Sequence, residues 1–131
     1  MKLDYSCARD ILLFLEQNLK ISVMNGAFCF DQLEINEVCK SLSKYERETI
    51  VYTTVMLEEA GYIETAHSGH DGIIGCIKYK RITFEGHQYL DSIRKDSIWS
   101  GILSTVKEKG VSLTFDIIKS IAIERIKAAM H

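Results

Sequence analysis

Apolar residues recur at helical spacing near the start of the chain. Leu12, Leu15 and Leu19 fall on one face of a helix, while Asp10 and Glu16 fall elsewhere. This separation of apolar and polar positions predicts an amphipathic first helix over residues 4–19.

Two short apolar runs follow, at residues 21–24 and 27–30, and Asn25-Gly26 separates them. The Asn-Gly dipeptide is a turn signal. The pattern predicts either a short strand or an extended connection around this turn.

A short second helix and a longer third helix are predicted next. Asn36 is suited to cap the second helix, over residues 37–42. Ser43 and Glu46 have the spacing of a capping box, in which each side chain accepts a hydrogen bond from the main chain of the other residue. The third helix is therefore expected over residues 44–60, and the short gap before it corresponds to the turn of a helix-turn-helix.

A glycine stop and a hairpin follow the third helix. Gly61 can end the helix because glycine takes the left-handed conformation at little cost. Residues 62–65 and 77–82 alternate as half-buried strands do, and a glycine-punctuated loop at residues 67–75 separates them. This segment predicts a β-hairpin that forms the wing of a winged helix.

The C-terminal part is predicted to be helical. Thr83 can cap a helix whose apolar pattern continues until Gly110, where a second glycine ends it. Ser112 or Thr114 can cap a last helix that extends to about residue 130.

These elements together predict an α+β fold: a winged helix-turn-helix with a β-hairpin wing and two additional C-terminal helices. Residues 1–95 are expected to form the winged helix-turn-helix domain. Residues 96–131 are expected to form a helical extension that packs on this domain or makes a dimer interface.

Two stretches resemble known protein families. The pattern Leu-x-x-Ala-Gly followed by two apolar residues, at residues 57–63, resembles the end of the recognition helix in winged-helix proteins. Residues 82–99 together with residues 110–116 are similar to a family of small bacterial and prophage proteins catalogued as a domain of unknown function. The second resemblance implies a winged-helix fold with a helical tail, and it brings no catalytic or binding residues with it.

Composition places the chain among ordinary globular proteins. The chain has 131 residues, of which 47% are hydrophobic and 26% are charged, and this suffices for one packed domain with an extension. No apolar run is long enough to span a membrane, and the first residues do not read as a secretory signal. The four cysteines match no zinc spacing, so we expect reduced, buried thiols in a cytoplasmic protein.

Charge is distributed unevenly along the chain. The net charge is −2, but residues 1–93 hold nine Lys and Arg against fourteen Asp and Glu, whereas residues 94–131 hold seven against four. A nucleic-acid-binding domain usually carries a strongly basic surface, and residues 1–93 lack the excess of cations that such a surface needs. The charge pattern therefore counts against strong non-specific DNA binding.

The middle of the third helix bears most directly on whether the predicted fold binds DNA. If its core face carries Ile50 and Leu57, then Val51, Tyr52 and Val55 face the position where DNA would lie. These side chains are poor readers of base edges. A helix that is apolar nearly all round is normally covered on both sides, so this face is either a DNA-reading surface or a buried interface.

The leading functional hypothesis is a non-enzymatic, bacterial or prophage-type DNA-binding or regulatory protein. The alternative is a winged-helix protein–protein interaction module that does not bind DNA. Lys78 and Lys80 share one face of their strand by the two-residue period. In a DNA-binding protein they would contact phosphates, and otherwise they belong to a solvated strand face. The nucleic-acid-binding candidates are Lys44, Arg47, Tyr52, Lys78, Lys80 and Arg81.

No catalytic constellation, metal site or cofactor motif emerges from the residues. His67 and His70 in the hairpin loop are too few to hold a metal. No small-molecule ligand and no membrane partner are expected. Double-stranded DNA is one predicted partner, and a second copy of the chain is another, because Ile123 and Ile126 widen the apolar area of the last helix beyond one core contact.

Overall fold

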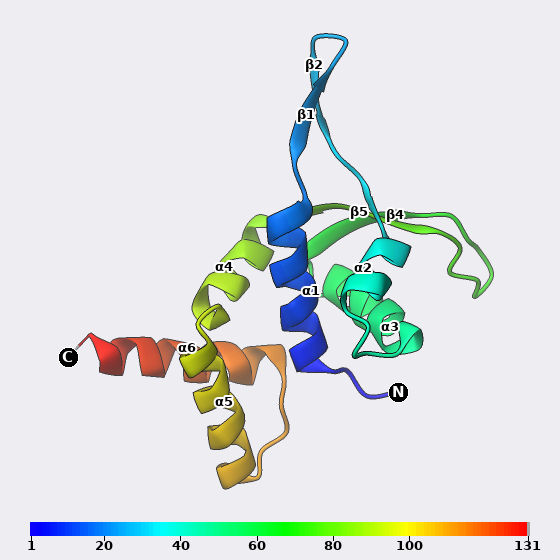
Figure 1. Ribbon diagram of the computed structural model, residues 1–131. Coiled ribbons are helices and arrows are strands. Elements are labelled where there is room, and N and C mark those ends of the chain that lie inside the picture. Colours follow the sequence, from blue (N-terminus) through cyan, green and yellow to red (C-terminus); the bar gives the residue numbers. More distant parts are fainter. Residues whose placement is uncertain (131) are drawn as a thin grey trace. The chain divides into compact units, whose positions relative to one another are not determined.

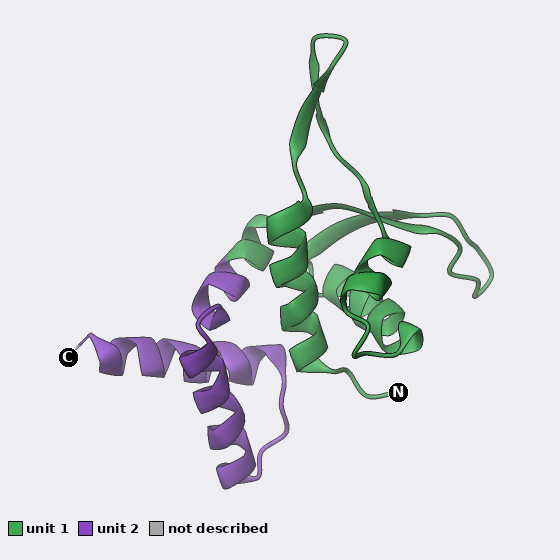
Figure 2. Ribbon diagram, in the orientation of Figure 1, with its two compact units in different colours: residues 1–87 green, residues 88–131 purple. Residues whose placement is uncertain are grey.

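The computed structural model describes residues 1–130, which form six helices and five strands in the order α1–β1–β2–β3–α2–α3–β4–β5–α4–α5–α6 (Figure 1). This mixture confirms the predicted α+β class. Contacts divide the chain into two compact units, residues 1–87 and residues 88–131 (Figure 2). The division falls inside α4.

Helix α1 spans Tyr5–Asn18, close to the predicted bounds. Asp4 caps it, because a side-chain oxygen of Asp4 accepts a hydrogen bond from the Cys7 amide at 2.9 Å. One face of α1 contributes much of the core of the first unit and contacts α3 and β5. The fully buried apolar residues of this face are Cys7, Ala8, Ile11, Leu12 and Leu15.

Strands β1 (Ile21–Met24) and β2 (Ala27–Phe30) pair as an antiparallel hairpin that extends away from α1 (Figure 1). Of the two predicted alternatives, the structure therefore has strands. Asn25 and Gly26 form the turn with φ angles of 52° and 78°, which Asn and Gly tolerate best. This hairpin is a two-stranded sheet of its own.

The predicted Asn36 cap is wrong. Strand β3 (Leu33–Glu34) pairs with β5, and α2 (Ile35–Ser41) follows it directly, so Glu34 occupies the N-cap without a side-chain hydrogen bond. The sheet pairing thus starts the helix earlier than local capping chemistry suggests. The Asn36 side-chain oxygen instead accepts a hydrogen bond from Arg47 Nη2 at 2.8 Å.

The predicted capping box is also wrong. Helix α3 spans Arg47–Glu59, and Glu46 is its N-cap without a side-chain hydrogen bond. Residues 44–45 stay outside the helix because both of their side chains bind α1: the Tyr45 hydroxyl donates to Asp10 Oδ2 at 2.6 Å, and Lys44 Nζ lies 3.0 Å from the same oxygen. These tertiary contacts, rather than the local capping signal of Ser43 and Glu46, determine where α3 begins.

The end of α3 confirms the predicted glycine stop. Gly61 has a φ angle of 81°, a conformation that glycine adopts readily. The Gly61 amide donates to the Glu58 carbonyl, and the Tyr62 amide donates to the Leu57 carbonyl, each at 3.0 Å. This pair of hydrogen bonds is the Schellman motif, and it turns the chain from α3 into β4.

Strands β4 (Ile63–His67) and β5 (Ile77–Ile82) form the predicted second hairpin, and the sheet order is β3-β5-β4. Glu64 pairs with Arg81 and Thr65 pairs with Tyr79, so Lys80 is the extra residue of a β-bulge. The buried residues of β5 are therefore Ile77, Tyr79 and Ile82 rather than a strict alternation.

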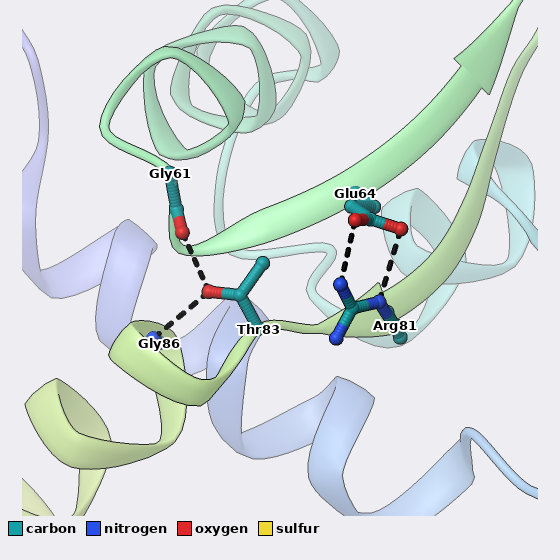
Figure 3. A network of polar contacts seen from close by, with 5 residues as sticks. All are labelled: Gly61, Glu64, Arg81, Thr83 and Gly86. Atoms are coloured by element: carbon teal, nitrogen blue, oxygen red, sulfur yellow. Dashed lines mark hydrogen bonds and ion pairs between the residues drawn. The ribbon is translucent and has the colours of Figure 1, made fainter.

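A polar junction joins the end of α3, the hairpin and the start of α4 (Figure 3). The Thr83 hydroxyl donates to the Gly61 carbonyl at 2.5 Å and accepts from the Gly86 amide at 3.0 Å, which caps α4 as predicted. A Cβ atom at Gly86 would collide with the main-chain oxygen of Tyr62. Glycine is therefore required where α4 approaches the link between α3 and β4.

The predicted helix between Thr83 and Gly110 is two helices, α4 (Phe84–Ile93) and α5 (Asp96–Lys109). The chain becomes extended at Lys95, which is the N-cap of α5, and this interrupts the helical pattern. Gly110 ends α5 in the left-handed conformation, with a φ angle of 66°, as predicted. Helix α6 (Phe115–Ala129) is capped by Thr114, whose hydroxyl accepts from the Ile117 amide at 3.1 Å, so Thr114 rather than Ser112 is the cap.

The second unit is held together by ring packing and by an arginine that crosses between helices. The rings of Tyr89 and Phe115 meet edge to face, with centroids 5.2 Å apart. Arg125 of α6 lies against Gly101 of α5, where any side chain would collide with its guanidinium, and donates to Thr105 at 2.9 Å.

The four cysteines are free thiols, as expected, but they differ in burial. Cys7 and Cys39 are buried, whereas Cys29 is partly exposed and Cys76 is exposed. The expectation of buried thiols is therefore wrong for Cys76. Among the helices of residues 1–130, none combines the length and apolar character needed to cross a membrane.

Candidate functional site

Helix α3 presents an apolar face on the side opposite the core. Ile50 and Leu57 are fully buried, which confirms the predicted core side of the helix. Val51, Tyr52 and Val55 are only half-buried, and they line an open hollow of about 540 Å³. We call these three residues the α3 face.

The loop between β4 and β5 contributes to the same hollow through Ile74, whose side chain is 45% exposed. The sequence pattern identified this segment only as the glycine-punctuated loop of the wing and did not single out Ile74. The adjacent apolar pair Ile73-Ile74 was the available signal, because two exposed isoleucines in a loop are uncommon without a contact to make.

Two charged residues of opposite sign line the hollow at the first turn of α3, and Met1 completes the lining. Arg47 and Glu48 are both exposed. The Arg47 guanidinium donates to the Asn36 side chain, so part of its hydrogen-bonding capacity is already used. The hollow therefore has an apolar floor and a mixed rim, without the excess of cations that a phosphate-binding surface needs.

Lys44 does not belong to this surface. Its ammonium forms an ion pair with Asp10 of α1, although the Lys44 side chain remains 68% exposed. The hydroxyl of Tyr45 shares the same carboxylate, and burial together with the hydrogen bond to Asp10 raises the pKa of Tyr45 above its usual value. Lys44 is thus part of a structural contact between the α2–α3 turn and α1.

Three cations of β5 lie outside the core. Lys78 and Lys80 do so by the normal alternation of the strand, and the bulge at Lys80 brings Arg81 to the outer side as well. Arg81 is held by Glu64 in a two-point contact, with Nε and Nη2 donating to the two carboxylate oxygens at 3.0 and 2.7 Å (Figure 3). The hydrogen bond from Arg81 lowers the pKa of Glu64, and nearby Lys80 acts in the same direction. Arg81 is therefore largely neutralised, and Lys78 and Lys80 remain as the hairpin's candidate phosphate contacts.

The structure brings only two of the six predicted nucleic-acid-binding residues into the hollow, Arg47 and Tyr52. Lys80 and Arg81 line a different hollow at the opposite end of β5, and Lys44 is engaged with α1. Across residues 1–87, nine Lys and Arg stand against thirteen Asp and Glu. The geometry favours an apolar contact surface over a basic one.

The chain matches the family model described as "Hypothetical protein (DUF2513)" over residues 2–112. It is also 30% identical over 122 residues to a protein of Haemophilus influenzae named "Uncharacterized protein", and the match covers 93% of this chain and 92% of that protein. No solved structure matches the chain.

Proposed function

This chain belongs to the DUF2513 family of hypothetical proteins, and we propose that it is a winged-helix regulatory module that binds a partner protein through the α3 face. The observation that carries this proposal is the open hollow lined by Val51, Tyr52, Val55 and Ile74. The proposal assigns no catalytic role to any residue.

The order of elements supports the winged-helix part of the proposal. Three helices, α1, α2 and α3, precede a hairpin, and the short strand β3 between α1 and α2 pairs with the last strand of that hairpin. In this interpretation α2 and α3 are the helix-turn-helix and the β4–β5 hairpin is the wing. The β1–β2 hairpin is an insertion between α1 and β3.

The chemistry of the α3 face supports a protein partner. In a helix-turn-helix that reads DNA, the second helix offers polar side chains to the edges of the bases. Val51 and Val55 offer only methyl groups, and Glu48 would face the phosphates with the wrong charge. A hollow with an aromatic side chain, aliphatic neighbours and a charged rim has the composition of a protein-binding surface.

A photo-crosslinking amino acid in place of Tyr52 tests this proposal in living cells. We expect ultraviolet light to join the full chain to another protein, giving an adduct that protease destroys and nuclease leaves intact. Val55→Asp should abolish the adduct, because a carboxylate in the hollow would have to be desolvated against apolar side chains. Leu103→Asp on α5 is the control, since it introduces the same charge at an exposed position of the second unit.

A nuclease-sensitive adduct at position 52 would overturn the proposal in favour of DNA reading. An adduct that forms equally well in Val55→Asp would also overturn it, because the contact would then not depend on the α3 face. The thermal stability of each variant, measured alongside, separates loss of binding from loss of folding.

DNA binding is the second candidate function, and the pair of lysines on the outer side of β5 is the observation that favours it. Lys78 and Lys80 lie outside the core by the two-residue alternation of the strand, and both can reach phosphates of a duplex. In this alternative the wing would hold the phosphate backbone, and α3 would contribute contacts from Val51 and Val55 to thymine methyl groups.

Self-association through α6 is also proposed. Ile123, Ile126 and Met130 are 50%, 38% and 79% exposed, which leaves an apolar strip on the last helix. Ile126→Lys should lower the mass of the particle measured by light scattering from that of a dimer to that of a monomer. A wild-type monomer at all accessible concentrations would refute this part of the proposal.

A further inference from the structure

A second hollow, of about 270 Å³, lies at the base of the β1–β2 hairpin and is separate from the α3 face. Four segments that are distant in sequence meet there: the end of α1, the first and last residues of the β1–β2 hairpin, the end of β5 and the first turn of α4. All of the lining residues belong to the first unit.

One wall of this hollow is apolar and uncovered. Ile21 and Phe30 are directly opposite each other in the hairpin, so their side chains share one face of it. They are 60% and 55% exposed, although both line the hollow. A two-stranded hairpin alone is only marginally stable in water, so this wall gains from an apolar group that covers it.

The polar part of the lining is mostly basic. Lys20, Lys80 and His87 line the hollow together with Arg81, whose charge Glu64 already balances. Glu16 is the one carboxylate among the described lining residues. This local balance opposes that of the first unit as a whole, where acidic residues outnumber basic ones, and it favours an anion.

We propose that this hollow binds a small organic anion that carries an apolar tail, such as a medium-chain carboxylate. Its charged group would be held by the ammonium groups of Lys20 and Lys80, and its tail would cover Ile21 and Phe30. The volume of about 270 Å³ lies just below the range of about 300–1,000 Å³ that is typical of small-molecule sites, so the ligand is small. This inference is independent of the proposed function, and it departs from the sequence-based expectation that no small molecule binds.

An apolar wall beside a basic rim fits a ligand that has both an apolar and an anionic part better than a ligand that has only one of them. Inorganic phosphate would satisfy the cations but leave Ile21 and Phe30 in water. A neutral hydrocarbon would cover the wall but make no ionic contact with the ammonium groups of Lys20 and Lys80. A ligand with both parts also links the hairpin to α1 and β5, so its binding should restrain the hairpin.

Calorimetric titration of the full chain with sodium octanoate tests the proposal, with octanol, acetate and inorganic phosphate as comparison probes. We expect octanoate to bind saturably at one site, and each comparison probe to bind at least about tenfold more weakly. Lys80→Met should weaken octanoate binding by about fivefold or more, because it removes one cation while keeping the length of the side chain. Lys78→Met, on the same strand but outside the hollow, is the matched control and should change the affinity less than about twofold.

Amide hydrogen exchange supplies a second readout that does not depend on the heat of binding. Octanoate should slow exchange of the β1–β2 amides in the wild type and in Lys78→Met, and should do so much less in Phe30→Ala. Phe30 is more than half exposed, so its truncation should leave the fold intact.

Four results would overturn the proposal. The first two are that octanoate fails to bind and that Lys80→Met binds octanoate as tightly as the wild type does. The third is a phosphate affinity equal to that of octanoate, which would make the hollow a site for simple anions. Protection that appears on α3 in place of the hairpin would overturn it as well, since the ligand would then occupy the other hollow.

Discussion

Removing the hydroxyl of Thr83 should destabilise the first unit, because this hydroxyl links the end of α3 to the start of α4. Thr83→Val keeps the shape of the side chain but deletes the hydrogen bond to the Gly61 carbonyl and the bond from the Gly86 amide (Figure 3). Gly61 is exposed, so water can replace the first bond. Gly86 is buried, so its amide would lose its partner without compensation.

The expected loss follows from the buried amide. Leaving a buried donor unsatisfied costs about 1–3 kcal/mol, and the loss of a helix cap costs about 0.5–2 kcal/mol, but both values describe the same bond and do not add. We therefore expect Thr83→Val to lower the free energy of unfolding by about 2 kcal/mol. For a chain of this length the corresponding fall in Tm is about 8 °C.

Urea unfolding followed by far-UV circular dichroism measures this loss, with the slope m compared between variants to confirm that the same surface unfolds. Thr83→Ser is the control, because it keeps the hydroxyl and deletes only a methyl group. A free energy of unfolding for Thr83→Val within about 0.5 kcal/mol of the wild-type value would contradict the predicted role of the hydroxyl. Equal instability of Thr83→Ser and Thr83→Val would also contradict it, since methyl packing would then account for the effect.

Three further predictions concern the core. Gly86→Ala should lower the free energy of unfolding by more than about 2 kcal/mol in urea titrations, because its Cβ would meet main-chain oxygen; a neutral effect would contradict the close approach. Tyr79→Phe and Thr54→Val should show a coupling of about 1 kcal/mol in a double-mutant cycle, since their hydroxyls lie 2.6 Å apart and are buried; additive effects would exclude a shared bond. Burial raises the pKa of Cys7 from 9.0 to about 11, so iodoacetamide at pH 8 should alkylate the exposed Cys76 and spare Cys7 in peptide mass spectra. Because the folded-state pKa is the higher one, stability should also fall as pH rises from 9 to 11.

Several elements could be predicted because their signals are local. The glycine stop at Gly61 and the turn at Asn25-Gly26 depend on backbone angles that few residue types accept, and both occur where the sequence indicates them. Thr83 and Thr114 are caps for an equally local reason, since each hydroxyl accepts from the main-chain amide three residues later.

Elements that depend on distant partners were not predictable in the same way. Ser43 and Glu46 have the spacing of a capping box, but the chain between them is held by Asp10, far away in the sequence. Strand β3 has only two residues, too few to show any alternation, and its pairing with β5 alone defines it. In both cases a tertiary contact overrode or replaced the local signal.

The two candidate sites also differ in how far local sequence patterns could predict them. The apolar character of Val51, Tyr52 and Val55 is visible in the spacing along a single helix, so the α3 face could be anticipated. The hollow at the hairpin base joins residues from four separate segments, such as Lys20 and His87, and no spacing along the chain connects them. Its basic rim became visible only when the fold brought these residues together.

The central claim is that the α3 face binds protein rather than reading bases, and fluorescence anisotropy of a labelled mixed-sequence duplex tests it most directly. The full chain is titrated at low salt and again at raised salt, with Val55→Asp beside the wild type. We predict no saturable binding even at low salt, because the first unit is acidic and Lys44 and Arg81 are held by carboxylates. Binding that is tight at low salt, weakens steeply as salt rises and is lost in Val55→Asp would contradict the claim.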